Sequence, residues 1–232
     1  MGSINQELAK VFTEFVNKVQ GDEDTWIVLA EKDLGGLPKP MIAAYQAAAK
    51  KRNTEGYAVV NTRSAVDPFL TFSSNRALRE KVWRAFIMRG DNANENNTNE
   101  LIKKIVKLRA DRAKLLGYPS HAHWRMSDTM AKDPAKAVEL LKRVWPAAVG
   151  RVKEEVADMQ ALADTEKAGI TIKPWDYRYY MEKVRQARYD LDQTEFKKYF
   201  ELNNMIRASY YMAERLYGYT FTEITGEIPT FQ

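Results

Sequence analysis

Helical spacing of apolar residues constrains the fold of this chain more than any other feature. From residue 74 almost to residue 217, apolar side chains recur at intervals of three and four, the spacing of one helix face. Glycine or polar breaks separate these stretches. The two stripes before Gly117 consist of Leu78, Val82, Ala85, Phe86, Leu101, Ile105, Leu108 and Leu115. The pattern predicts a mainly α protein, a multi-helix array with a few short strands.

The longest predicted helix begins at Asp133 and Pro134, because an aspartate N-cap followed by proline is a strong start signal. Pro146 lies inside this helix, where it removes a backbone donor and clashes with the preceding turn. One apolar stripe nevertheless runs through both sides of Pro146. We therefore expect a kink at Pro146 and an end at Gly169.

Other helix boundaries follow from capping residues. Asn97 or Thr98 is expected to cap the helix that ends at Gly117, and Ser120 to cap a short helix reaching residue 130. Two further helices are predicted over residues 174–189 and 203–217.

The N-terminal third also contains helical patterns. Apolar residues from Leu8 to Val19 predict an amphipathic helix, with Ser3 and Gln6 as its capping box and Gly21 as its end. The alanine-rich residues 41–50 favour a second helix.

Three segments show strand character. Residues 25–30 and 57–60 are rich in β-forming residues, with helix as the alternative for 25–30. Residues 219–224 alternate with period two and predict a third strand, which would need a partner from a region outside this chain. Residues 61–68 are expected to form a loop.

Charge and composition limit the classes of function. The formal net charge is +5, but Lys and Arg are spread along helices that also carry Asp and Glu, so we expect no nucleic-acid partner. The chain has no cysteine, which excludes disulfides and thiolate catalysis. No apolar run approaches a membrane span, and the first residues do not form a secretory leader. We therefore expect a cytoplasmic protein without a membrane partner.

His121 and His123 are the two histidines of the sequence. A helical zinc-peptidase motif needs His-Glu-x-x-His, because residues four apart share a helix face and can hold one ion. Two residues apart on a helix, these imidazoles diverge by about 200°. We therefore predict no metal ligand and no catalytic residue in this chain, and interpret both histidines as surface or packing residues at a helix start.

Residues 173–190 form the segment with the densest aromatic content. Trp175 and Tyr179 share one face of the predicted helix, while Tyr177 and Met181 share another. Packing between helices is one interpretation of this segment, and a ligand-facing role for some of the aromatics is the other. Asp176, in the first turn, is explained as a partner of the helix dipole.

Several blocks together resemble the bacterial peptidyl-dipeptidases of the thimet-oligopeptidase family of zinc metallopeptidases. The resemblance extends over residues 34–231 and is weaker over residues 1–33. In chain order, the blocks read LGGLPKPMIAAYQAAAKK, VDPFLTFSSNRALREKVWRAF, IVKLRADRAKLLGYPSHAHWRMSDTMAKDPAKAVELL, PWDYRYYMEKVRQARYDLD and YGYTFTEITGEIPTF.

The resemblance implies a nearly all-helical bowl with a deep channel and a catalytic zinc at its floor. The His-Glu-x-x-His helix and the other catalytic residues come later in the family's chain, so none maps onto this sequence. Residues 1–33 would form an N-terminal helix and connector, and residues 34–232 the helical region upstream of the catalytic domain. The full-length enzyme would bind Zn2+ and release C-terminal dipeptides from oligopeptides.

By the same resemblance, this chain supplies channel-wall helices and is inactive alone. Trp175, Arg178, Tyr179 and Tyr180 are the candidate peptide contacts, because aromatic rings and a guanidinium suit peptide backbones and carboxylates. Its partners would be the missing catalytic domain and, through an exposed apolar face, a second copy of itself. The alternative is a stand-alone, non-catalytic helical module that binds peptides or a protein.

Overall fold

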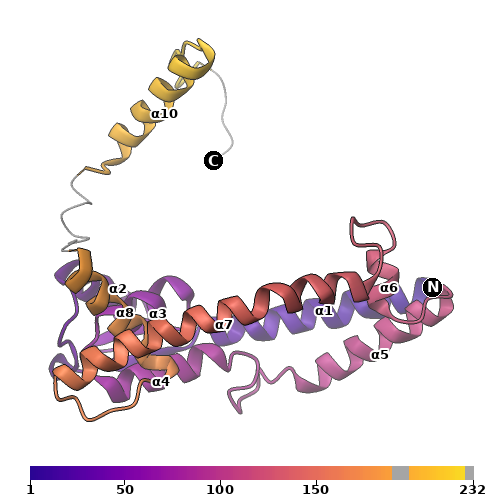
Figure 1. Ribbon diagram of the computed structural model, residues 1–232, viewed down its shortest axis with the longest axis horizontal. Coiled ribbons are helices and arrows are strands. Elements are labelled where there is room, and N and C mark those ends of the chain that lie inside the picture. The colour runs from indigo at the N-terminus through magenta and orange to yellow at the C-terminus, as the bar shows by residue number, and fades with distance from the viewer. Residues whose placement is uncertain (190–198, 228–232) are drawn as a thin grey trace. The chain divides into compact units, whose positions relative to one another are not determined.

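The computed structural model describes residues 1–189 and 199–227 (Figure 1). The chain divides into two compact units, residues 1–184 and 185–232. The mainly α prediction is confirmed. The elements are α1 (Gly2–Glu23), β1 (Trp26–Leu29), η1 (Glu31–Asp33), α2 (Lys39–Lys51), β2 (Tyr57–Val60), α3 (Arg63–Phe72), α4 (Arg76–Ile87), α5 (Asn99–Leu115), α6 (His121–Met126), α7 (Pro134–Thr165), α8 (Pro174–Tyr189) and α10 (Leu202–Tyr217).

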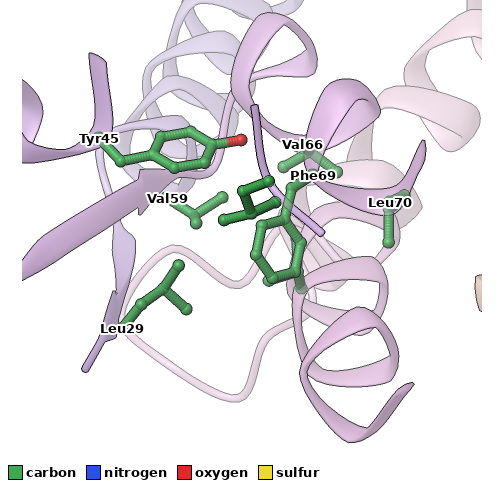
Figure 2. Close-up of a cluster of buried hydrophobic side chains, with 8 residues drawn as sticks. Leu29, Tyr45, Val59, Val66, Phe69 and Leu70 are labelled. Carbon is green, nitrogen blue, oxygen red and sulfur yellow. The ribbon is translucent and has the colours of Figure 1, made fainter. Parts of the chain in front are cut away.

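A two-stranded sheet lies at the centre of the first unit's largest core. β1 and β2 pair antiparallel, with Trp26 opposite Val60 and Leu29 opposite Tyr57, so both predicted strands are confirmed. Their inner face packs against α2, α3 and α4. Figure 2 shows members of this core from the two strands, α2 and α3. The buried members of this core are Leu29, Leu37, Tyr45, Val59, Val66, Phe69, Leu70 and Val82.

The prediction of a loop over residues 61–68 is wrong, because α3 begins at Arg63 and contains Pro68. The apolar spacing explains this result: Val66, Phe69 and Leu70 lie on one helix face and are all buried. Burial of that face outweighs the backbone hydrogen bond that proline removes.

α1 and α5 lie side by side and enclose a smaller core formed by Leu8, Val11 and Ile105. The predicted capping box is absent from α1, because Met1 occupies the N-cap position and makes no side-chain capping bond. The helix also continues through Gly21 to Glu23. Its last turn contains Asp22, whose carboxylate is fully buried. The contacts of this side chain stabilise the turn after Gly21, where the sequence predicted the end of the helix.

α7 continues through Pro146, as predicted, but it ends at Thr165 and not at the expected Gly169; the kink at Pro146 stays a prediction. The aspartate N-cap accepts a hydrogen bond from the N–H of Ala135 at 2.7 Å. Its C-terminal half contributes Met159 and Ala163 to a third core with Tyr180 of α8. Its N-terminal half is largely exposed: the exposed fraction is 67% for Leu141 and 70% for Trp145. α6 is shorter than predicted and ends at Met126.

In the second unit, α10 ends at Tyr217, and the following residue, Gly218, adopts the left-handed conformation with φ of 71°. The predicted strand over residues 219–224 does not form in the described part of the chain. Aromatic contacts hold this segment against α10: Phe221 stacks on Tyr210 with ring centroids 4.5 Å apart. A strand needs a hydrogen-bonding neighbour, and the described part of the second unit contains no strand that could pair with this segment. The last four residues of the YGYTFTEITGEIPTF block, 228–231, lie outside the described residues.

Across the described helices, none combines the length and apolarity that crossing a membrane requires.

Candidate functional site

A buried carboxylate fixes the start of α8 against α4. Asp176 is fully buried and accepts hydrogen bonds from Arg76, whose Nη2 lies 2.8 Å from Oδ2, and from Arg79, whose Nη2 lies 2.8 Å from Oδ1. The N–H of Lys173 donates to Oδ2 at 3.1 Å. Arg79 also donates to the carbonyl of Ser73 at 2.8 Å, so one guanidinium joins α8 to the turn before α4.

The charge of Asp176 is strongly favoured in this setting. Burial alone raises the pKa of the carboxyl group, but hydrogen bonds from Arg76, Arg79 and the Lys173 N–H outweigh burial and hold the pKa below its ordinary value. Arg79 is only 2% exposed, and Asp176 is the counterion of its buried guanidinium. Asp176 is therefore ionised at neutral pH and holds two arginines of α4.

Two of the predicted peptide contacts, Trp175 and Tyr179, face these arginines. The rings of Trp175 and Trp83 lie 5.7 Å apart, and the guanidinium of Arg76 lies 5.8 Å from the Trp175 ring. Arg79 stacks on Tyr179 at 4.2 Å. The indole N–H of Trp175 is buried without a hydrogen-bond partner among the described residues. The shared face predicted for Trp175 and Tyr179 thus packs against α4.

Arg178 and Tyr180, the other two predicted contacts, have different environments. Arg178 is partly exposed and pairs with Asp67 of α3 at 3.1 Å. Tyr180 is 4% exposed, packs against Met159 and Ala163, and contacts Tyr179 edge-on at 5.3 Å. All four predicted contacts therefore lie on α8, but the Tyr180 side chain is buried in a core and the other three are partly exposed.

A pocket of about 510 Å³ opens beside the start of α8. Its walls come from α3, α4, α7 and α8 and from the segment before α8. Apolar and aromatic side chains dominate the lining, and the charged residues in it, Lys173 and Arg178, are both cationic. The lining residues are Leu70, Trp83, Val156, Ile172, Lys173, Pro174, Tyr177, Arg178 and Met181.

The two histidines lie on the short helix α6, as the Ser120 capping signal predicts. Nδ1 of His123 lies 2.8 Å from Oγ of Ser120, which also accepts the N–H of His123. His121 packs against Trp124 with ring centroids 5.5 Å apart. Burial, followed by the nearby charges of Arg109, Arg112 and Arg125, lowers the pKa of His121.

These residues do not fit a zinc ion. Both imidazoles make packing or capping contacts, and the positive surroundings of His121 oppose a cation. Within residues 1–189 and 199–227, no group of three or more His, Cys, Asp or Glu is arranged to hold a metal.

Comparison with known proteins identifies the protein family of this chain. A model of Peptidase family M3 matches residues 69–231, which include both α4 and α8. The chain belongs to peptidase family M3. This is a zinc metallopeptidase family, so the family resemblance predicted from the sequence blocks is confirmed.

Relatives within family M3 match almost the whole chain. Dipeptidyl carboxypeptidase of Escherichia coli is 31% identical, with 98% of this chain and 34% of the relative covered. Oligopeptidase A of Salmonella typhimurium is 29% identical, with 97% of this chain and 34% of the relative covered. A probable cytosolic oligopeptidase A of Arabidopsis thaliana is 28% identical over 98% of this chain and 34% of its own length. The chain thus spans about a third of the length of these curated relatives.

Sequence reasoning missed the central ion pairs of this site. Asp176 lies in the first turn of α8, which agrees with the predicted dipole role, but its main partners are two arginines about a hundred positions earlier in the chain. A weak signal existed: Arg76 and Arg79 are three residues apart and so share a face of α4. The sequence alone does not show that Asp176 is the partner of these two arginines, because the fold brings them together.

Proposed function

We propose that this chain forms a non-catalytic, helical part of a zinc-dependent peptidase that releases C-terminal dipeptides from oligopeptides. Its membership in family M3 carries the proposal, together with the similarity to a dipeptidyl carboxypeptidase over nearly its whole length. The His-Glu-x-x-His motif is absent from the sequence, so zinc and the catalytic residues belong to another part of the enzyme. On this proposal, the cytoplasm is its location.

In this role, the chain contributes wall to a peptide channel and is inactive alone. The peptide contacts come from the α8 region, where Trp175, Arg178 and Tyr179 are partly exposed. Tyr180 supports them from the core behind, because it packs against Tyr179 and the C-terminal half of α7. The ion pairs of Asp176 hold this surface in place.

A stand-alone peptide-binding module is the second candidate function. The pocket of about 510 Å³ favours it, because the pocket is formed entirely by residues 70–181 of the first unit. The two candidates differ in whether the chain works with a catalytic part, and both predict that the chain alone does not cleave peptides.

Dipeptide release is the experiment that tests the proposal. The folded chain is incubated with an oligopeptide and zinc, and the products are analysed by mass spectrometry. We expect no dipeptides from the chain alone, whereas the E. coli dipeptidyl carboxypeptidase, as positive control, gives a product series. Turnover that co-purifies with this chain and is abolished by chelation would refute the proposal.

A further inference from the structure

The pocket beside the start of α8 has the size and lining of a small-ligand site. Its volume of about 510 Å³ falls within the range of about 300–1,000 Å³ that is typical of such sites. Trp83, Tyr177 and Met181 provide large apolar surfaces, and Leu70 and Val156 complete the wall. A pocket of this composition favours an aromatic or branched apolar group.

The edge of the same pocket is positively charged. Lys173 and Arg178 both line it, and the ammonium group of Lys173 forms no ion pair with any described residue. Arg178 pairs with Asp67 through Nη2, and a guanidinium has further N–H donors to offer. An anionic group next to an apolar group therefore matches this site.

We infer that the pocket binds the C-terminal residue of an oligopeptide. The apolar side chain packs against Trp83 and Met181, and the terminal carboxylate lies beside Lys173 and Arg178. A C-terminal apolar residue carries both required groups on one Cα atom, which suits a pocket where cationic and apolar residues line the same space. The inference rests on the proposed peptide-binding role and specifies its ligand.

Calorimetric titration of the 232-residue chain with three peptides tests this assignment. The first is acetyl-Ala-Ala-Phe with a free carboxylate, the second is its C-terminal amide, and the third is acetyl-Ala-Glu-Phe amide, whose carboxylate is in a side chain. We expect the free acid to bind at least about tenfold more tightly than either amide, because only it places both groups on the terminal residue.

Two variants locate the binding. Lys173→Glu reverses the unpaired charge at the pocket, and we expect it to weaken binding of the free acid by about tenfold or more. Lys142→Glu makes the same change on an exposed part of α7 outside the pocket and leaves binding unchanged. Val156→Phe fills the apolar wall and abolishes binding without changing any charge. Circular dichroism confirms that each variant is folded.

Several results would overturn the inference: no binding by the folded chain, equal binding of the acid and its amide, or equal binding of the glutamate peptide. An equal effect of the substitutions at Lys173 and Lys142 would also reject it. These binding results are independent of the dipeptide-release experiment. The pocket assignment can therefore fail while the proposed peptidase role stands, and the peptidase role can fail while the pocket still binds the peptide.

Discussion

At the scale of single residues, the first unit depends on two buried aspartates that organise distant segments. Asp176 joins α8 to two arginines of α4, and Asp22 joins α1 to the loop before α5. Both carboxylates are fully buried, and donor groups satisfy both. A buried charge with a complete set of partners stabilises one arrangement, because removing either side leaves the other unpaired.

Replacing Asp176 with Asn removes the charge and turns an N–H donor group toward two guanidinium groups. Arg79 is then left buried without a counterion, so we expect the free energy of unfolding to fall by about 3–5 kcal/mol. Urea denaturation measures this change. Asp128→Asn, at an exposed position, is the matched control and should change stability by less than about 0.5 kcal/mol. Similar midpoints for the two variants would contradict the role assigned to Asp176.

The pH dependence of stability follows from the same carboxylate. Because the folded-state pKa of Asp176 is lower than the unfolded-state pKa, its contribution is complete above the ordinary value of 3.8 and is lost as the pH falls through the folded-state pKa. We expect the stability difference between wild type and Asp176→Asn to shrink as the pH falls below 3.8. Denaturation at pH 7 and at successively lower pH checks this, and a constant difference would contradict it.

At the scale of elements, local sequence patterns correctly predicted two helix caps and the two strands of the sheet. Asp133 and Ser120 cap the helices that they were expected to cap, and both strands of the sheet were found from their β-forming residues. The errors occurred where tertiary contacts outweigh local signals. α3 forms despite Pro68 because its apolar face is buried, and residues 219–224 are not a strand because no neighbour pairs with them.

The loop over residues 91–97 shows the same limit. Its asparagines predict an irregular segment, but they do not reveal that three of them converge on one acceptor. The side-chain amides of Asn92, Asn94 and Asn96 donate to Asp22, as does the N–H of Gly90 at 2.7 Å. Burial raises the pKa of Asp22, but these donors outweigh burial and lower it. The loop is thus anchored to the last turn of α1.

Replacing Asp22 with Ala removes the acceptor for all four donors. We expect the free energy of unfolding to fall by about 3 kcal/mol or more, because each buried group left unpaired costs about 1–3 kcal/mol. The amide of Gly90 should also exchange its hydrogen faster, which NMR measures directly. Glu14→Ala, at an exposed position on the same helix, is the control. Unchanged exchange at Gly90 in the Asp22 variant would show that the anchor is unimportant.

At the scale of the whole molecule, the first unit has a sound core but an uncovered helix face. The N-terminal half of α7 exposes a run of large apolar side chains, which is unusual for a helix surface in contact with water. On the proposed function, this face would meet another part of the enzyme. The exposed residues of this half are Val138, Leu140, Leu141, Val144 and Trp145, and Val152 lies just beyond it.

We predict that this face makes the isolated chain self-associate as its concentration rises. Size-exclusion chromatography with light scattering measures the mass at several concentrations. Trp145→Glu places a charge on the face and should shift the chain toward monomer, whereas Lys142→Glu changes charge nearby without removing an apolar group. A monomer at every concentration, or equal effects of the two variants, would contradict this prediction.

The central claim is that this M3-family chain is a helical, non-catalytic part of a peptidase. The most direct test is the zinc content of the folded chain after exposure to excess zinc and dialysis, measured by elemental mass spectrometry. We predict far less than one zinc ion per chain, because two histidines engaged in packing and capping provide no site. One tightly held zinc ion per chain would contradict the account.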